Sequence, residues 1–258
     1  MNTTHSIDVA ASAFLTPARA PMVGKEPVPA GAPDRRFASP FGAIAGWVRG
    51  SGPSVLLVHG WSGTHVDLAG FVDPLVAAGR RVISIDLPAH GQSEGKMASI
   101  PDLARAILWV AEEIGPLDGV VAHSVGCAAT GVALKQGLGA PRVVLIAPPA
   151  RYAHFARAFA RQAGVDPEAL LAALRSRDID IDSIDFPAMA PHLKSRALII
   201  HSKDDQVVPF ANGLSIAAAW QGAVLLERDG LGHGRILADT EAIAASVSFI
   251  TGQTTEIF

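Results

Sequence analysis

Short apolar runs alternate with longer stretches of helical periodicity along most of this chain. Six of the runs are rich in Val, Ile and Leu and are bounded by turn-forming residues: 54–58, 81–86, 117–122, 143–146, 197–201 and 223–227. A continuous apolar run is typical of a strand that is covered on both faces, as in a parallel sheet. We therefore expect these six runs to form the centre of one sheet.

Helices are expected between these strands, at residues 66–78, 101–114, 125–138, 210–220 and 239–250. Strand-helix-strand alternation at this spacing predicts right-handed crossovers and a mostly parallel sheet. One or two opening strands are expected just before the first run, turned near Pro40-Phe41-Gly42. The predicted fold class is α/β, with about seven or eight strands flanked by helices.

Two segments depart from this rhythm. Residues 1–35 are rich in Pro, Ala and Gly, so we expect a loosely structured lead-in on the surface of a domain that spans 36–258. An insertion at about 148–195 holds two short helical stretches, 153–162 and 167–175, before an Asp/Ile-rich part. The insertion is too short for an independent domain, and it predicts a small helical cap over the carboxyl edge of the sheet.

Composition narrows the class of protein. The chain has 258 residues, and 49% of them are hydrophobic, which argues against disorder. Its formal charge of -3 argues against nucleic-acid binding. No run approaches eighteen apolar residues, so no membrane span is expected. The first residues lack a basic region and Asp8 interrupts their apolar stretch, which argues against a signal peptide. The single cysteine, Cys127, fits a reducing compartment, and we expect a cytoplasmic protein.

The first chemical signal is Ala122-His123-Ser124-Val125-Gly126, at the junction of a predicted strand and a predicted helix. A sharp strand-to-helix turn presents a serine hydroxyl in a strained conformation and requires small residues two positions before and after it. Ala122 stands where the common G-x-S-x-G pattern has its first glycine, and it nearly satisfies that requirement. The motif predicts Ser124 as a nucleophile, with His123 lining the turn.

Three further signals follow other predicted strands. His59-Gly60-Trp61 can offer a backbone N–H to an oxyanion, with a second N–H from Val125. The Asp204-Asp205 pair can supply a carboxylate that orients an imidazole. His233 stands among glycines, which leave its ring free to swing over a neighbouring strand end. Each signal alone fits an ordinary turn or helix cap. Together they give the order Ser, Asp, His, with each residue at the carboxyl end of a parallel strand.

The stretch from about residue 53 to 249 resembles the α/β-hydrolase superfamily, and in particular esterase-like bacterial enzymes with a small cap. The resemblance rests on these motifs: His59-Gly60-Trp61, Asp86-Leu87-Pro88-Ala89-His90-Gly91-Gln92-Ser93, the turn around Ser124, Asp205-x-x-Val208-Pro209 and Gly232-His233. The resemblance implies an α/β-hydrolase fold and the following roles: Ser124 as nucleophile, Asp205 as acid, His233 as base, and Trp61 and Val125 as backbone oxyanion donors. It also implies that the segment from Asp86 to Ser93 is structural, so His90 is given no catalytic role.

These residues predict a serine hydrolase that cleaves a carboxylic ester or thioester through an acyl-enzyme on Ser124. Acyl transfer, perhydrolysis and C–C bond hydrolysis use the same three residues and remain alternatives, as does a non-catalytic ligand-binding protein of this fold. The expected partner is a small acyl substrate. No cofactor is needed, and the histidines show no metal-ligand spacing. His123, Phe155 and Phe159 are candidates for substrate contact, although packing of the cap explains the two phenylalanines equally well. The sequence carries no signal for an oligomeric state.

Overall fold

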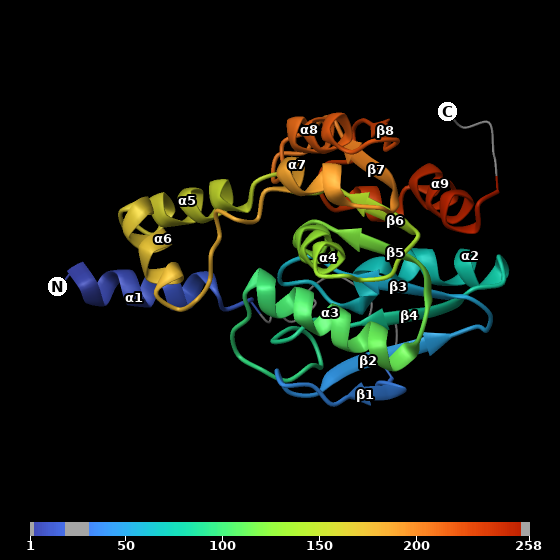
Figure 1. Ribbon diagram of the computed structural model, residues 1–258, viewed down its shortest axis with the longest axis horizontal. Helices are drawn as coiled ribbons and strands as arrows, with labels where there is room; N and C mark the ends of the chain where they lie inside the picture. The colour runs from blue at the N-terminus through green and yellow to red at the C-terminus, as the bar shows by residue number, and fades with distance from the viewer. Residues whose placement is uncertain (1–2, 19–30, 254–258) are drawn as a thin grey trace.

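A single sheet of eight strands forms the centre of the described chain (Figure 1). The computed structural model describes residues 3–18 and 31–253, so part of the predicted lead-in, residues 19–30, lies outside the described residues. The strands are β1 Arg35–Phe37, β2 Ile44–Arg49, β3 Ser54–Val58, β4 Arg81–Ile85, β5 Leu117–His123, β6 Arg142–Ile146, β7 Arg196–Ser202 and β8 Val224–Arg228.

The sheet is mostly parallel, as the alternation of strands and helices predicts. Its order is β1-β2-β4-β3-β5-β6-β7-β8. The pairs β1–β2 and β2–β4 are antiparallel, and all other neighbours are parallel. Strand β3 lies between β4 and β5, so the chain first builds outward in one direction and then crosses to the other side of β3. This reversal is where ligands bind in open α/β sheets. The predicted α/β fold with seven or eight strands is confirmed.

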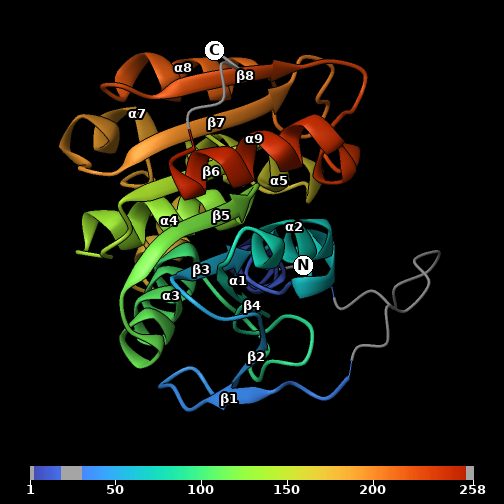
Figure 2. The same ribbon diagram turned by 90° about the vertical axis from the view of Figure 1, so that its right-hand side faces the viewer.

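Helices cover both faces of the sheet (Figure 2). The α-helices of the described chain are α1 Thr3–Phe14, α2 Val72–Ala77, α3 Ile100–Ile114, α4 Val125–Lys135, α5 Tyr152–Gln162, α6 Pro167–Arg175, α7 Phe186–Met189, α8 Ala211–Ala219 and α9 Thr240–Thr251. Three 3-10 helices join them: η1 His65–Phe71, η2 Ala190–His192 and η3 Arg235–Ala238. Helices α2 and α9 lie on one face, and α3 and α4 on the other. None of these helices is long and apolar enough to cross a membrane.

Two hydrophobic cores follow from this layering. Alternate residues of β3 point to opposite faces, with Leu56 and Val58 in the core under α3 and α4, and Val55 and Leu57 in the core under α2 and α9. All four are at most 1% exposed. Because both faces of the strand are buried, the sequence reads as a continuous apolar run rather than as an alternating one.

The insertion between β6 and β7 holds α5, α6, α7 and η2. Helix α6 begins where its sequence indicates, because Asp166 accepts a hydrogen bond from the backbone N–H of Ala169 and Pro167 is the first helical residue. Helix α7 was not expected from the sequence. It begins in the same way, with Asp185 as its N-cap and Pro187 in the first turn.

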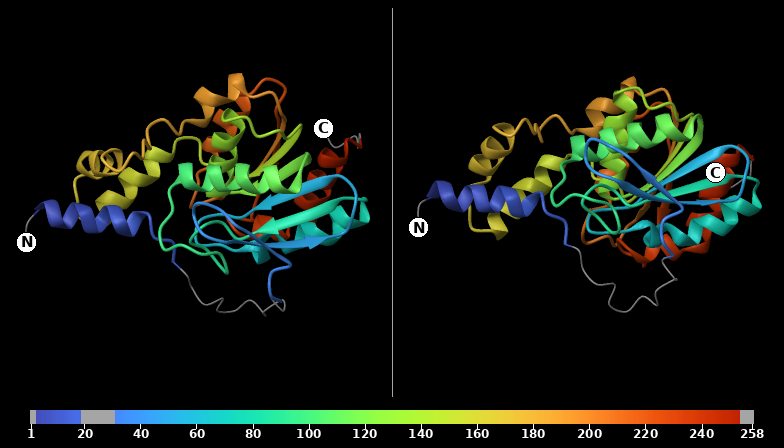
Figure 3. Two further views of the ribbon diagram at one scale, coloured as in Figure 1. Left: turned by 60° about the horizontal axis from the view of Figure 1, so that its bottom comes forward. Right: turned by 90° about the horizontal axis from the view of Figure 1, so that it is seen from below.

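The expectation of a loosely structured lead-in at residues 1–35 is wrong for its first part, which forms the twelve-residue helix α1. Ala10, Ala11 and Phe14 fall on one side of this helix at helical spacing, and all three are buried in the core that α3, α4 and the insertion share. Helix α1 runs beside α5 and α6, away from the sheet (Figure 3). The small apolar face of α1 packs against these helices and not against the sheet. The composition of residues 1–35 does not reveal this packing, and it therefore favoured a loop.

Candidate active site

The carboxyl ends of β3, β5, β7 and β8 bring the predicted site residues together. Trp61 follows β3, Ser124 follows β5, Asp205 follows β7 and His233 follows β8. Parallel strands end at the same edge of the sheet, so residues that are far apart in the sequence meet there. Strands β3 and β5 are neighbours at the point where the strand order reverses.

Ser124 occupies a strained turn between β5 and α4. Its φ is 52° and its ψ is −123°, a left-handed conformation that a residue with a side chain rarely adopts. The turn fits because its flanking residues are small. A Cβ at Gly126 would collide with the carbonyl oxygens of Val58 and His59, whereas Ala122 lies within β5 and is fully buried without a positive φ. The close approach of α4 to β3 therefore requires glycine at 126, and alanine suffices at 122.

His233 joins Ser124 to Asp205. Its Nε2 lies 2.9 Å from the Ser124 hydroxyl oxygen, and its Nδ1 lies 2.8 Å from Oδ2 of Asp205. An ionised carboxylate can only accept a hydrogen bond, so Nδ1 carries the proton and its N–H donates a hydrogen bond to Asp205. Nε2 is then left as the acceptor for the Ser124 hydroxyl. In this tautomer the imidazole is placed to take a proton from the serine.

The Asp205 carboxylate is held by both of its oxygens. Oδ1 accepts hydrogen bonds from the backbone N–H groups of Val207 and Val208, at 2.8 and 2.9 Å. Burial raises the pKa of Asp205, but the hydrogen bonds from His201, His233 and the backbone lower it by more, so its pKa lies well below the ordinary value. Asp205 is therefore ionised when it faces His233.

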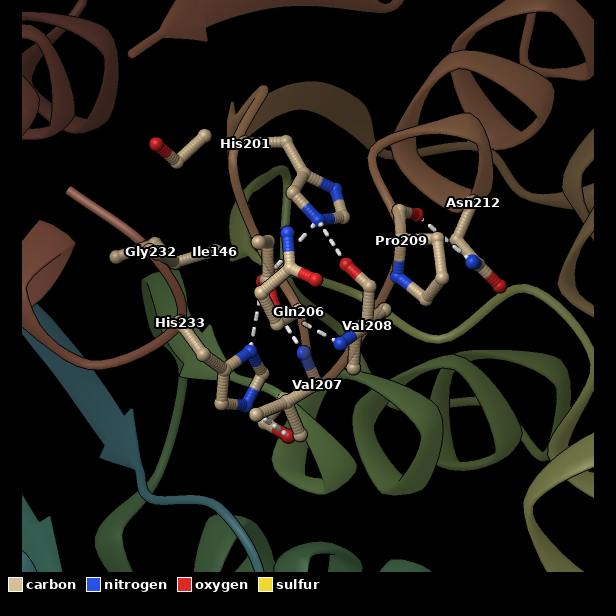
Figure 4. A network of polar contacts seen from close by, with 12 residues as sticks. Ile146, His201, Gln206, Val207, Val208, Pro209, Asn212, Gly232 and His233 are labelled. Carbon is tan, nitrogen blue, oxygen red and sulfur yellow. Dashed lines mark hydrogen bonds and ion pairs between the residues drawn. The ribbon is translucent and has the colours of Figure 1, made fainter. Parts of the chain in front are cut away.

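A second imidazole, that of His201, approaches Asp205 from the other side. Its Nε2–H donates to the backbone carbonyl of Val208 at 2.8 Å and lies 3.4 Å from Oδ2 of Asp205. Figure 4 shows the rings of His201 and His233 on opposite sides of the loop that carries Gln206 and Val207. His201 is fully buried. It fixes both the carboxylate and the loop that presents it, a role that the sequence did not reveal because His201 reads as the end of an apolar strand.

Asp204 has a different task. Its Oδ1 accepts hydrogen bonds from the hydroxyl of Ser202 and from the backbone N–H of Gly232, the latter at 2.9 Å. Gly232 immediately precedes His233, so Asp204 anchors the turn that carries the imidazole without contacting the ring. The two adjacent carboxylates thus serve the same histidine, one by direct contact and the other through the backbone.

The loop after β3 passes close to Ser124. A Cβ at Gly60 would lie only 3.0 Å from the Cβ of Ser124, so the lack of a side chain at Gly60 permits this approach. Trp61 and Val125 both line the cavity that opens at Ser124. The two predicted oxyanion donors therefore lie near the serine on different elements, Trp61 in the loop after β3 and Val125 at the start of α4.

The cavity beside Ser124 has a volume of about 460 Å³. Ser124 and His233 are among the residues that line it. Two of the other lining residues, Thr16 and Ser62, are polar. The rest are apolar or aromatic: Ala13, Phe14, Ala18, Trp61, Val125, Pro149, Tyr152, Phe155, Phe159, Val207 and Val208. A cavity of this size and lining suits a small organic ligand that presents one polar, reactive group.

The predicted substrate contacts divide into two cases. Phe155 and Phe159 of α5 do line the cavity. His123 is not among the lining residues, so the structure gives no support to the expectation that it contacts substrate. Its Nε2–H donates to the backbone carbonyl of His233 at 3.0 Å, and the side chain is 8% exposed. Burial, followed by the charge of His233, lowers the pKa of His123 to about 4. His123 is thus a neutral support for the turn that carries His233.

The segment from Asp86 to Ser93, after β4, is held by hydrogen bonds to its own backbone and to neighbouring loops. Asp86 accepts hydrogen bonds from the backbone N–H groups of His65 and Gln92, both at 2.7 Å. His90 is buried and its Nδ1–H donates to the carbonyl of Pro88. Across the described residues, the structure contains no cluster of three His, Cys, Asp or Glu side chains that could hold a metal ion.

Comparison of the sequence with known proteins identifies a family and one relative. The sequence model of the alpha/beta hydrolase family matches residues 55–194. A curated relative, the dihydrolipoyllysine-residue acetyltransferase component of an acetoin cleaving system from Cupriavidus necator, is 34% identical over 99 residues. That match covers 37% of this chain and 25% of the relative, so the chain corresponds to about a quarter of the relative's length.

Several solved structures share the fold. An esterase from Exiguobacterium antarcticum superposes with a TM-score of 0.67 at 17% identity, covering 83% of this chain and 98% of that one. An enol-lactonase from Burkholderia xenovorans gives 0.66 at 22% identity, with 84% and 100% covered. A meta-cleavage product hydrolase from Pseudomonas fluorescens gives 0.66 at 18%, with 85% and 98% covered. At these identities the likeness establishes the fold and leaves the reaction open.

Proposed function

Since this chain belongs to the alpha/beta hydrolase family, we propose that it is a serine hydrolase that cleaves a carboxylic ester or thioester through an acyl-enzyme on Ser124. The observation that carries the proposal is the unbroken chain of hydrogen bonds from Ser124 through His233 to Asp205, which starts at the wall of a largely apolar cavity. A structural serine does not need an imidazole and an ionised carboxylate aligned behind it.

In the proposed first step, His233 takes the hydroxyl proton of Ser124 while the oxygen attacks the carbonyl carbon of the substrate. The Asp205 carboxylate stabilises the imidazolium that forms. The collapsing intermediate expels the alcohol or thiol, which receives the proton from His233. Water then attacks the acyl-enzyme by the same route, with His233 again as the base, and releases the carboxylic acid.

The negative charge that develops on the carbonyl oxygen requires fixed donors. We assign this role to the backbone N–H groups of Trp61 and Val125, because both residues flank Ser124 in the cavity. Val125 is also the first residue of α4, so its N–H is one of those that the helix itself leaves without a partner. Donors of this kind are each worth about 3 kcal/mol in the barrier.

Acyl transfer is the second candidate, because an alcohol or thiol can resolve the same acyl-enzyme in place of water. The relative from Cupriavidus necator, which is named an acetyltransferase, motivates this alternative. For either reaction the proposed partner is a small acyl compound and the proposed compartment is the cytoplasm.

A p-nitrophenyl ester assay tests the proposal. We expect turnover by the wild-type chain, no turnover above background by Ser124→Ala, and an acyl adduct on Ser124 when the reaction is quenched early and analysed by peptide mass spectrometry. Product analysis with an added alcohol separates hydrolysis from transfer. Equal turnover by wild type and Ser124→Ala would exclude the proposed nucleophile.

A further inference from the structure

The N-terminal helix forms one wall of the cavity at Ser124. Ala13 and Phe14 of α1, with Thr16 and Ala18 just after it, line the cavity together with Trp61 and Ser62. These residues come from the segment before the first strand of the sheet. The insertion between β6 and β7 and the N-terminal segment therefore both contribute to the cavity, beside the loops at the strand ends.

The aromatic ring of Phe14 is the largest of these contributions. Its centroid lies 5.3 Å from that of Phe159 and 5.8 Å from that of Tyr152, both in tilted geometry. Phe14 is 9% exposed. The three rings form a single apolar surface, so the extent of the cavity on this side depends on Phe14 as much as on helix α5.

Hydrogen bonds hold helix α1 against the cap and the rest of the domain, so the wall that it forms has a fixed position. Arg177, after α6, donates to the carboxylate of Asp8 at 3.2 Å and to the hydroxyl of Ser12 at 3.4 Å. The backbone N–H of Ala98 donates to the carbonyl of Leu15. Contacts at the middle of α1 and just after its last residue therefore set the position of the Phe14 ring.

The chain after α1 also reaches the loop that carries Trp61. The backbone N–H of Ala18 donates to the hydroxyl of Ser62 at 2.9 Å, and both residues line the cavity. The N-terminal segment thus extends from the aromatic surface to the residue next to a proposed oxyanion donor. A bound acyl chain that leaves Ser124 on this side meets α1 before it meets solvent.

The lining also defines the chemistry of the ligand. Among the described residues that line the cavity there is no Asp, Glu, Lys or Arg side chain, and His233 is the one titratable group besides Tyr152. Burial raises the pKa of the Tyr152 hydroxyl, which keeps it neutral. An ionised group placed in this cavity would lose its hydration without gaining a counter-charge. A neutral, apolar chain loses nothing comparable.

We propose that helix α1 is part of the acyl-binding pocket, that the pocket takes neutral, apolar acyl groups, and that Phe14 sets the chain length it accepts. The proposal rests on the proposed function of Ser124, since it assigns the cavity to the acyl group of the same substrate. The Phe14 ring ends the pocket on the side of α1, and a smaller side chain there extends it toward Tyr152 and Phe159.

The test compares Phe14→Ala and the milder Phe14→Leu with Val9→Ala, which shortens an apolar side chain on the same helix that is 56% exposed. The readout is kcat/KM for a series of p-nitrophenyl esters of increasing chain length. We expect the ratio of long-chain to short-chain kcat/KM to rise about tenfold in Phe14→Ala and by less in Phe14→Leu. Val9→Ala is expected to keep the wild-type ratio. An unchanged ratio in both Phe14 variants would overturn the proposal.

A binding measurement separates this proposal from the proposed function. Straight-chain aliphatic amides of increasing length are titrated by calorimetry into Ser124→Ala and into the double variant with Phe14→Ala. We expect the longest amide that binds to be longer in the double variant. If wild type turns over no ester but this shift is seen, the proposed reaction is contradicted and the proposed role of α1 in the pocket is supported. If the amides bind both variants with the same length dependence, the wall is wrong whatever the reaction.

Discussion

The Oδ2 atom of Asp205 lies 2.8 Å from Nδ1 of His233, whereas the carboxylate of the adjacent Asp204 accepts from Ser202 and from the backbone before the histidine. These two neighbouring acidic residues thus have different tasks, because the turn after β7 directs their side chains to different partners. We expect Asp205→Asn to lower turnover by about four orders of magnitude, because the histidine then adopts the wrong tautomer.

The matched change at the neighbour gives the control. Asp204→Asn keeps an oxygen that can accept from the backbone N–H of Gly232, so we expect its turnover to fall by less than about tenfold, or roughly 1.4 kcal/mol in the barrier. Turnover of both variants is measured on one ester, with folding checked by thermal melting. A crippled Asp204→Asn beside an active Asp205→Asn would contradict the assignment.

The strain at Ser124 predicts a stability cost for the proposed nucleophile. A residue with a side chain at this positive φ costs about 1–3 kcal/mol, and glycine avoids most of that cost. We expect Ser124→Gly to be more stable than Ser124→Ala, with a free energy of unfolding that is about 1 kcal/mol higher. This figure already subtracts the greater entropy of glycine in the unfolded chain. Both variants should be inactive. Equal unfolding free energies from urea titration would show that the turn is not strained.

The buried His123 predicts that stability falls on acidification. Its pKa is about 4 in the folded protein and 6.5 as its ordinary value. Between these pH values the unfolded chain binds the proton and the folded chain does not, so the free energy of unfolding decreases as the pH falls from 6.5 to 4 and levels off below. We expect His123→Gln, which keeps a donor for the His233 carbonyl, to remove about 3 kcal/mol of this decrease.

Urea unfolding at a series of pH values measures this effect. His154→Gln, at an exposed position on α5, serves as the control and should retain the wild-type slope. Parallel curves for wild type and His123→Gln would mean that His123 takes up its proton equally in both states.

The sheet and the site were predictable for a physical reason. Buried parallel strands must be apolar on both faces, and the four site loops follow such strands, so Ser124, Asp205 and His233 could be located from their places at strand ends. The resemblance alone selected Asp205 over Asp204. The contact of His201 with Asp205 could not be found, because a histidine at the end of an apolar strand gives no sign of the direction in which its ring turns.

The N-terminal wall was missed for another reason. The apolar face of α1 is made mainly of alanines and Phe14, and it packs against α5 and α6, which lie more than a hundred residues further along the chain. A pattern within twelve residues cannot reveal such a partner. The same limit explains why His123 was expected near the substrate, since its distance from the cavity depends on the turn that holds His233.

The central claim is that Ser124 is activated by His233, and labelling by a fluorophosphonate tests it most directly because the probe reports nucleophilicity without requiring the natural substrate. Wild type, Ser124→Ala, His233→Ala and His90→Ala are incubated with the probe at neutral pH, and the adduct is quantified by intact mass and located by peptide mapping. We predict one adduct, on Ser124, formed at similar rates in wild type and His90→Ala and lost in Ser124→Ala and His233→Ala. Labelling that persists in Ser124→Ala, or that proceeds at the wild-type rate in His233→Ala, would contradict the account.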